Sequence, residues 1–248
     1  MHSGEPAVLV DGLTKRFRHA VAVDGVSFTV PRGAAFGLLG RNGAGKTSTI
    51  KMLTTLSPLT AGRAAVAGFD VAAQPFDVRR HIGYVPQAQS ADVDLTGFEN
   101  LLVFAKLYRI PRAERGARIA DALALMGLAR FAGLLVRHYS GGMVRRLEIA
   151  QATLHHPDVL FLDEPTVGLD PVARRAVWGR VKELRTRLGT TVFLTSHYMD
   201  EVGELCEHVA FLHEGRLVAS GTPAELCASV GPQATLDDVF VQLTTRRP

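Results

Sequence analysis

The sequence predicts an α/β fold built around a buried parallel sheet. Three segments, at residues 159–162, 191–194 and 209–212, are continuously apolar, and a helical pattern lies between the first two. Strands that are apolar on both faces are typical of parallel sheets covered by other elements on both sides. A further apolar strand at 35–39 leads into a glycine-rich loop and then a helix. We therefore expect a parallel-sheet core around that loop.

The composition is that of a globular protein. The chain has 248 residues, 47% hydrophobic and 21% charged, which excludes a disordered chain. The net charge of +4 is small, so no nucleic-acid partner is expected. The densest arginine pairs, at 145–146, 174–175 and 246–247, are interpreted as solvated helix faces.

The same composition bears on the compartment. No run of 18 uncharged apolar residues occurs, so we expect no membrane span. The first six residues lack the features of a secretion signal. The two cysteines, Cys206 and Cys227, form no metal-binding spacing or disulfide framework, which fits a reducing cytoplasm.

The N-terminal third is expected to contain strands before its first helix. Alternating apolar residues at 8–10 and 26–30 predict antiparallel strands, followed by a turn at 31–33. After the strand at 35–39 and its loop, apolar residues at helical spacing, Ile50, Leu53 and Leu56, predict a helix. A strand at 81–85 is stopped by Pro86.

A helical block is inserted between that strand and the rest of the sheet. Residues 95–154 are mainly helical in pattern, with a capping box at Thr96 and Glu99 and a helix at 112–126 stopped by Gly127. Beyond the block, a helix starts with Asp170 as N-cap and ends at Gly189, and two shorter helices follow from Thr222 and over 235–243.

The glycine-rich loop carries the strongest chemical signal. It matches the phosphate-binding pattern G-x-x-x-x-G-K-[ST] with Gly40, Arg41, Asn42, Gly43, Ala44, Gly45, Lys46 and Thr47. Glycines let consecutive backbone N–H groups wrap a phosphate, and the lysine adds positive charge at the β- and γ-phosphates. Thr47 can ligate Mg²⁺, and the helix that carries Ser48 directs its positive end at the anion. These residues are the predicted nucleotide-binding set.

Two carboxylates end the apolar strand at 159–162. Asp163 and Glu164 are expected at the sheet edge where α/β proteins bind ligands. Asp163 is the predicted magnesium ligand, and Glu164 is predicted to polarise the attacking water. Together with the phosphate loop, they indicate an ATPase that uses ATP and Mg²⁺.

Several weaker features support a functional interpretation through their order along the chain. Ser140, Gly141 and Gly142 open a helix with free N–H groups, which suits a second anion site. Gln87 follows the strand at 81–85, residues 168–171 follow Glu164, and His197 follows the strand at 191–194. Each alone is more typical of a structural role. Their combined order and spacing carry the functional interpretation.

With these motifs, nearly the whole chain resembles the ATP-binding subunit of ABC transporters. The resemblance implies a phosphate-loop ATPase domain over residues 1–248. Its parts would be the parallel-sheet core, an N-terminal antiparallel β subdomain, an inserted helical subdomain at about 88–154 and a short tail at about 222–248. It also implies that Gln87 senses the γ-phosphate and contributes to the magnesium site. His197 would contact the γ-phosphate, and Phe17 would stack on adenine.

The resemblance further implies partners and a location. Two copies would form a head-to-tail homodimer on binding ATP, with each ATP held by one phosphate loop and by Ser140, Gly141 and Gly142 of the other copy. The helical subdomain would dock on a separate integral-membrane permease, which places the chain at the cytoplasmic face of the membrane. Catalysis would rest on Glu164, His197, Lys46 and Gln87.

Within the family, the chain is similar to the multidrug and antibiotic exporter type, as in daunorubicin-resistance ATPases. The shared segments are residues 139–143, 196–201 and 236–240, including Met143 where the common signature has glutamine. Two alternatives stay open at this point: a soluble ABC ATPase not involved in transport, and the ATPase subunit of an importer.

Overall fold

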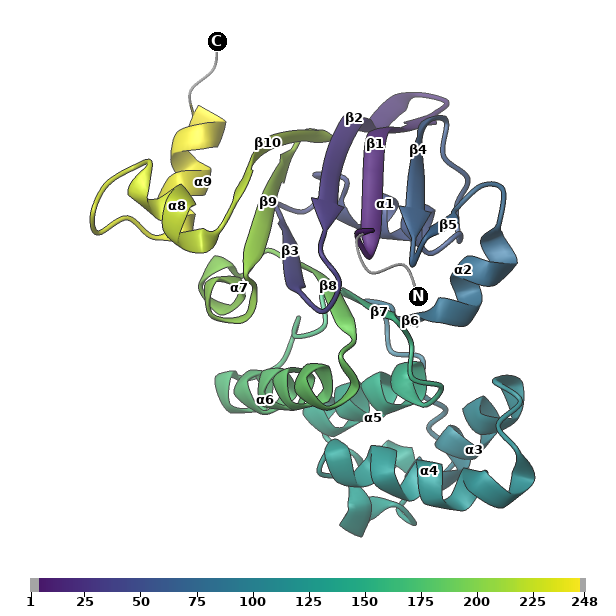
Figure 1. The fold of residues 1–248 in the computed structure, drawn as a ribbon. Coiled ribbons are helices and arrows are strands. Elements are labelled where there is room, and N and C mark those ends of the chain that lie inside the picture. Colours follow the sequence, from purple (N-terminus) through teal and green to yellow (C-terminus); the bar gives the residue numbers. More distant parts are fainter. Residues whose placement is uncertain (1–4, 246–248) are drawn as a thin grey trace.

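The computed structural model describes residues 5–245, except for the side chains of residues 200, 201 and 204. Its strands form a six-stranded sheet, ordered β10-β9-β3-β8-β7-β6, and a four-stranded sheet, ordered β2-β1-β4-β5 (Figure 1). The predicted α/β fold is thereby confirmed. Three predictions reach beyond the described residues: the missing secretion signal in part, the arginine pair at 246–247, and part of the exporter-like segment 196–201.

The six-stranded sheet is the parallel core. The strands β3 (Ala35–Leu39), β6 (Ile82–Val85), β7 (Val159–Asp163), β8 (Thr191–Ser196) and β9 (His208–His213) run parallel, and β10 (Arg216–Gly221) pairs antiparallel at one edge. Because β3, β7 and β8 are parallel neighbours, their carboxyl ends meet at one edge of the sheet. At that edge, β3 is followed by the phosphate loop, β7 by Glu164 and β8 by His197.

The core strands are mainly apolar on both faces because the sheet separates two apolar layers. Along β7, Leu160 and Leu162 pack into one layer, whereas Val159 and Phe161 pack into the other. Side chains alternate between the faces of a strand, so both faces need apolar residues. The first layer lies against the helices, and the second lies against the four-stranded sheet.

The four-stranded sheet consists of β1 (Val8–Phe17), β2 (Ala20–Val30), β4 (Ala61–Val66) and β5 (Phe69–Asp70). Val8 pairs with Val30 of β2 and with Val66 of β4, so β1 is central and antiparallel to both neighbours. Phe28 of β2 stacks on Phe36 of the core sheet with ring centroids 5.2 Å apart. This contact joins the two sheets.

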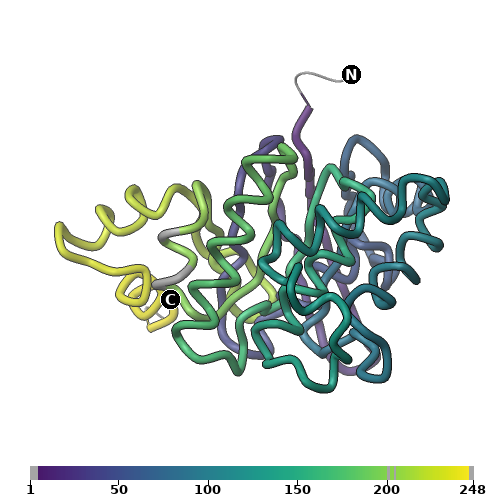
Figure 2. The backbone as a smooth tube through the Cα atoms, turned by 90° about the horizontal axis from the view of Figure 1, so that it is seen from below, coloured from purple at the N-terminus to yellow at the C-terminus, as the bar shows by residue number. Residues whose placement is uncertain are grey.

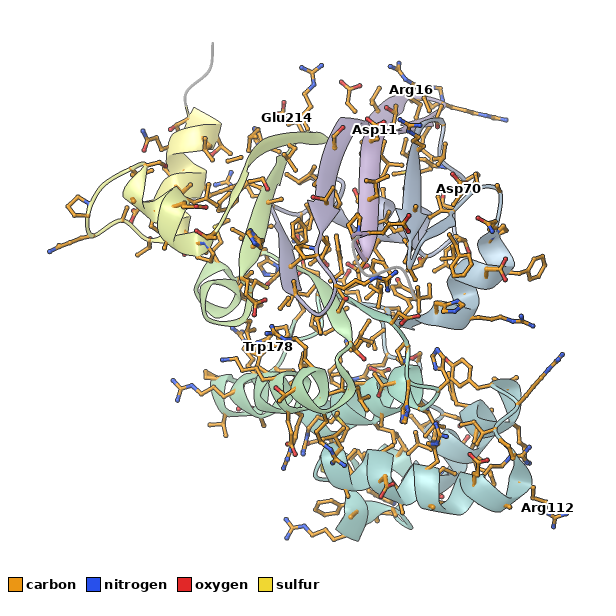
Figure 3. All side chains as sticks on the ribbon, viewed as in Figure 1. Asp11, Arg16, Asp70, Arg112, Trp178 and Glu214 are labelled. Atoms are coloured by element: carbon orange, nitrogen blue, oxygen red, sulfur yellow. The ribbon has the colours of Figure 1, made fainter. Side chains whose placement is uncertain are left out.

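Helices cover the other face of the core sheet. They are α3 (Gly97–Leu107), α4 (Arg112–Leu125), α5 (Gly141–Thr153) and α6 (Pro171–Leu188), with 3₁₀ turns at Ala129–Phe131 and Val136–His138. The predicted caps are confirmed at Thr96, Ser140 and Asp170. Figure 3 shows Trp178 on the side of α6 that faces the sheet, where it is buried.

Two local expectations need correction, and two strands of the four-stranded sheet were missed. The first helix, α1 (Lys46–Leu53), ends before Leu56, which is 58% exposed. His81 closes a helix, α2 (Pro75–His81), instead of opening a strand. The strands β4 and β5 were not predicted, because Ala-Gly-Arg-Ala-Ala-Val contains one β-branched residue and no regular alternation.

The C-terminal segment packs at the end of the core sheet that β9 and β10 form. The helices α7 (Met199–Leu205), α8 (Pro223–Ala228) and α9 (Leu236–Thr245) lie there, and Phe240 of α9 is 5.7 Å from Phe211 of β9 between ring centroids. Figure 2 shows this end and the helical segment α3–α4 on opposite sides of the molecule. Within residues 5–245, no helix combines the length and the apolar character needed to cross a bilayer.

Candidate active site

The phosphate loop joins the end of β3 to the start of α1. Its backbone takes a left-handed conformation at Gly45, with φ of 108°, a region that side chains other than glycine rarely adopt. A Cβ at Gly45 would overlap the carbonyl oxygen of Ala22, and a Cβ at Gly40 would overlap that of Leu212. Glycine is therefore required at both ends of the loop by the neighbouring backbone.

Lys46 lies inside this loop, and its side chain is 5% exposed. Its Nζ donates hydrogen bonds to the carbonyl oxygens of Gly40 at 2.7 Å and Arg41 at 3.2 Å. It also forms an ion pair with Glu164, with Nζ 2.9 Å from Oε1. The buried ammonium group is thus held by the loop on one side and by a carboxylate on the other.

Glu164 is held between Lys46 and His197. Its Oε2 accepts a hydrogen bond from Nδ1 of His197 at 2.7 Å, and its side chain is 5% exposed. The backbone of Glu164 is left-handed, with φ of 49°, which is uncommon for a residue with a Cβ. Its backbone N–H donates to the hydroxyl oxygen of Thr195 at 3.0 Å, which holds the turn in place.

Asp163 faces the first turn of α1. Its Oδ1 accepts hydrogen bonds from the hydroxyl groups of Thr47 at 3.2 Å and Thr195 at 2.7 Å. Asp163 is 1% exposed. Burial raises the pKa of Tyr84 to about 12, and the nearby Asp163 carboxylate adds to this effect. The strand end therefore places two hydroxyl groups around one buried carboxylate.

An open cavity of about 270 Å³ brings most of the predicted site together. It is lined by Ala22, Arg41, Asn42, Gly43, Gly45, Lys46, Thr47, Ser48, Gln87 and Glu164. Gln87 is exposed and follows the end of β6. It lines the same cavity as Thr47, although the two residues are 40 positions apart in the chain. His197 lines an adjoining cavity together with Gly40 and residues of α9.

Six predicted residues lie outside the lining of these two cavities: Phe17, Ala44, Ser140, Gly141, Gly142 and Asp163. Phe17 ends β1, is 56% exposed and has Nζ of Lys15 5.0 Å above its ring. Ser140 caps α5 by accepting a hydrogen bond from the backbone N–H of Met143 at 3.4 Å. Gly141 and Gly142 follow it against α6, where a Cβ on Gly142 would lie 3.0 Å from the Cβ of Ala173. The signature glycines therefore also have a packing role within the chain. The functional roles assigned to these and the other predicted site residues stay predictions.

Two important residues were missed or misread from the sequence. Thr195, which binds both Asp163 and Glu164, was not singled out, although its place just before Ser196 and His197 was a usable signal. Arg145 is 6% exposed, so the interpretation of its pair as a solvated helix face is wrong. Of the pair at 174–175, Arg175 is exposed as expected, whereas Arg174 is half-buried with its guanidinium 4.0 Å from the ring centre of Tyr198.

The core sheet, the phosphate loop and the acidic strand end define a phosphate-loop ATPase. The family model described as ABC transporter matches residues 23–167. The chain is 44% identical over 225 residues to the daunorubicin/doxorubicin resistance ATP-binding protein DrrA of Streptomyces peucetius, covering 91% of this chain and 68% of that protein. It is 42% identical to the Nod factor export ATP-binding protein I of Ralstonia nicotianae, covering 89% of this chain and 68% of that protein.

A solved structure described as the ATP binding subunit of an ABC transporter superposes with a TM-score of 0.85. It is 31% identical, and the match covers 96% of this chain and all of that one. The chain belongs to the ABC transporter family. It is an ATPase of that family, and the expectation drawn from its motifs is confirmed.

Proposed function

We propose that the chain binds Mg-ATP, hydrolyses it within a head-to-tail homodimer, and thereby drives a separate membrane permease that exports drug- or antibiotic-like compounds. The cluster of Lys46, Glu164 and His197 beside the phosphate loop carries this proposal, because it combines phosphate binding with a candidate base. Attachment to the permease would hold the chain at the cytoplasmic face of the membrane.

ATP binding changes the partner of Lys46. The loop N–H groups surround the phosphates, and Lys46 lies where it neutralises the β- and γ-phosphates. Its ion pair with Glu164 competes with this role, since Nζ is 2.9 Å from Oε1. A γ-phosphate carries more negative charge than one carboxylate and draws the lysine toward itself. Phe17 supplies the stacking surface for adenine.

The oxygens around Asp163 fit a magnesium ion. The hydroxyl of Thr47 and the carboxylate of Asp163 lie 3.2 Å apart and are hard oxygen ligands, and Mg²⁺ takes few protein ligands beside phosphates and waters. Gln87 lines the same cavity and is the third predicted ligand. When bound, the ion neutralises charge that develops on the transferred phosphoryl group.

Glu164 acts on the attacking water. Once Lys46 has moved to the phosphate, Oε1 is free to accept a proton from water, while His197 holds Oε2 at 2.7 Å. The water oxygen bonds to the γ-phosphorus, and the bond to ADP breaks, releasing ADP and inorganic phosphate. Catalysis of this kind rests mainly on positioning and electrostatic stabilisation.

The dimer supplies the other half of each site. Ser140, Gly141 and Gly142 begin a helix but do not line the cavities around their own phosphate loop. Helix N-termini favour anions, which supports binding of the γ-phosphate of a partner copy. Gln87 would relay the state of this phosphate to the helical subdomain at about 88–154 and on to the permease.

The exporter assignment rests on relatives whose names refer to daunorubicin resistance and to export of Nod factor. Purification of the tagged chain from membranes of its native host tests it. Recovery of an integral-membrane partner supports the transporter role. Recovery without any membrane protein favours the soluble ABC ATPase alternative.

Glu164→Gln tests the catalytic mechanism. The change keeps the shape of the side chain and removes the base, so we expect ATP hydrolysis to fall by at least about 100-fold. ATP binding persists, and the ATP-bound dimer accumulates because turnover no longer removes it. Light scattering with size exclusion measures the dimer. A chain that stays monomeric with saturating Mg-ATP and its permease contradicts the shared-site mechanism.

Ser140→Arg is the complementary variant. Added bulk at the start of α5 blocks the partner's phosphate but lies away from the chain's own phosphate loop. The variant is expected to bind ATP as a monomer and to dimerise poorly.

A further inference from the structure

Helix α5 carries a buried ion pair directly beyond the predicted signature residues. Arg145 and Glu148 lie in its first turns, with Nη1 of the arginine 3.0 Å from Oε2 of the glutamate. Their side chains are 6% and 1% exposed. Burying two charges costs free energy that mutual attraction often fails to recover. Apolar residues of similar volume would fill this space at a lower cost in free energy. The pair therefore calls for a role other than stability, which its polar contacts indicate.

Arg145 binds the backbone that surrounds Gln87. Its Nη1 donates to the carbonyl oxygen of Pro86 at 2.7 Å, and its Nη2 donates to that of Gln87 itself at 2.8 Å. The planar guanidinium group thus spans two consecutive carbonyl groups, a geometry that lysine cannot reproduce. Burial lowers the pKa of Arg145, and the carboxylates of Glu148 and Asp163 partly counteract this.

Glu148 binds the other end of the same loop. Its Oε1 accepts hydrogen bonds from the backbone N–H and hydroxyl of Ser90 and from the backbone N–H of Ala91. Its Oε2 is close to Arg145 but makes no well-aligned hydrogen bond among the described residues. The carboxylate is therefore oriented by the loop amides, and the arginine balances its charge.

A third connection closes the loop at Asp92. Gln151 lies further along α5 than Arg145 and Glu148. Its side chain donates a hydrogen bond to Oδ1 of Asn100 at 3.1 Å. Asn100 in turn exchanges hydrogen bonds with the backbone of Asp92, at 2.9 Å and 3.0 Å. Side chains of α5 and of its neighbour α3 thus bind both ends of the loop at residues 86–92.

We propose that Arg145 and Glu148 are positioning residues that make the loop at 86–92 and helix α5 move as one body. ATP at the chain's own phosphate loop acts on Gln87, the ion pair carries the displacement to α5, and α5 moves Ser140, Gly141 and Gly142 relative to the partner's ATP. This inference rests on the composite site of the proposed function. It assigns the coupling between the two ATP sites to two side chains that touch neither nucleotide.

Arg145→Lys and Glu148→Gln test the coupling in the full chain carrying Glu164→Gln, with Mg-ATP as the ligand. Both variants are expected to bind a fluorescent ATP analogue within about twofold of the parent. The ATP concentration that gives half-maximal dimerisation rises about tenfold or more, within the usual range of coupling between sites. Hydrogen exchange adds a readout that a merely structural role would not change: ATP still protects residues 40–48 but no longer alters exchange in α5.

Arg115→Lys is the matched control. Arg115 is a half-buried arginine of the helical segment, and it likewise donates a hydrogen bond to a backbone carbonyl, that of Ile110 at 2.7 Å. It does not contact residues 86–92 among the interactions described, so its replacement should leave dimerisation unchanged. The double variant Arg145→Met with Glu148→Leu keeps the interior filled without buried charge. It should fold and show the same loss of coupling.

The outcomes separate this inference from the proposed function. If ATP fails to protect residues 40–48 in the parent, the proposed function fails. If the parent responds and the variants dimerise at the parent's ATP concentration with an unchanged α5 response, the coupling role is overturned. Equal loss of ATP binding and dimerisation in the folded double variant also overturns it, because the pair would then serve the nucleotide site directly.

Discussion

One hydroxyl group holds both acidic residues of the site. Thr195 on β8 is fully buried, donates to Oδ1 of Asp163 at 2.7 Å and accepts from the backbone N–H of Glu164 at 3.0 Å. Glu164 has a left-handed backbone, which costs free energy for a residue with a Cβ. The hydroxyl therefore orients a predicted metal ligand and stabilises the turn that presents the predicted base.

Thr195→Val removes this hydroxyl and keeps the shape of the side chain. Asp163 and the Glu164 N–H each lose a buried partner, so we expect the free energy of unfolding to fall by about 1–3 kcal/mol. ATP hydrolysis should fall on the order of 10-fold to 100-fold, because small displacements of reacting groups are costly. Chemical denaturation and a phosphate-release assay measure the two effects.

Thr190→Val is the control for this change. Thr190 is 1% exposed and donates a hydrogen bond to the carbonyl oxygen of Pro157 at 2.9 Å, at the opposite end of β8. It should lose stability of similar size and keep its ATPase rate. Equal losses of activity in both variants would show that Thr195 acts through stability alone.

At the scale of elements, a half-buried histidine ties α5 to the edge of the core sheet. His155 follows α5, its Nε2 is 3.1 Å from the carbonyl oxygen of Ile82 on β6, and its ring stacks on Tyr108 with centroids 3.9 Å apart. Burial lowers the pKa of His155 to about 4, partly offset by the bond to Ile82, and His156 and His81 lower it further. The folded chain therefore keeps this ring neutral.

The low pKa makes stability depend on pH. Above pH 6.5 the ring is neutral in both the folded and unfolded chain. As the pH falls from 6.5 toward 4, His155 becomes protonated in the unfolded chain but stays neutral in the folded chain. The free energy of unfolding therefore falls by up to about 1.4 kcal/mol per pH unit. His155→Gln should flatten the dependence of unfolding free energy on pH in this window. An unchanged slope in urea denaturation would assign the dependence to other groups.

Elements with strong local signals were predictable from the sequence. The helix α6 has an N-cap at Asp170, Pro171 at its first position and Gly189 after its end, and the structure has the same limits. By contrast, β5 has two residues and α2 has seven, too short for a periodic pattern. These elements form because β5 pairs with β4 and α2 packs against β5 and β6, and that information lies elsewhere in the chain.

The candidate site divides in the same way. The phosphate loop, Asp163 and Glu164 were predictable because contiguous residues at the end of a strand carry the chemistry. The burial of Arg145 was not, because the carbonyl groups of Pro86 and Gln87 reach it only after the helical block has folded back. A pair of adjacent arginines has the same local pattern on a solvated helix face.

At the scale of the whole molecule, ATP should stabilise the fold. The phosphate loop joins the core sheet to α1, so a ligand bound there favours the folded chain over the unfolded one. In the Glu164→Gln chain, Mg-ATP at 100 times its Kd should raise the free energy of unfolding by about 2.7 kcal/mol. The melting temperature should rise by roughly 5–10 °C for a chain of this size.

Adding Lys46→Ala to that chain should remove most of the rise, because the loop then lacks its main charge for the phosphates. Differential scanning fluorimetry with and without Mg-ATP measures both chains. A similar rise in the two would place the stabilising nucleotide away from the phosphate loop.

The order of the strands has a mechanical consequence. The strand β6, which leads into residues 86–92, is four residues long and is hydrogen-bonded within the described sheet to one neighbour, β7. The strands β3, β7 and β8, which lead to the phosphate loop, Glu164 and His197, each have a neighbour on both sides. Tilting β6 therefore strains one ladder, whereas tilting any of the others strains two. The chain combines a stiff frame around the predicted reacting groups with a compliant edge. If it binds ATP as proposed, we expect the resulting motion where the helical segment begins.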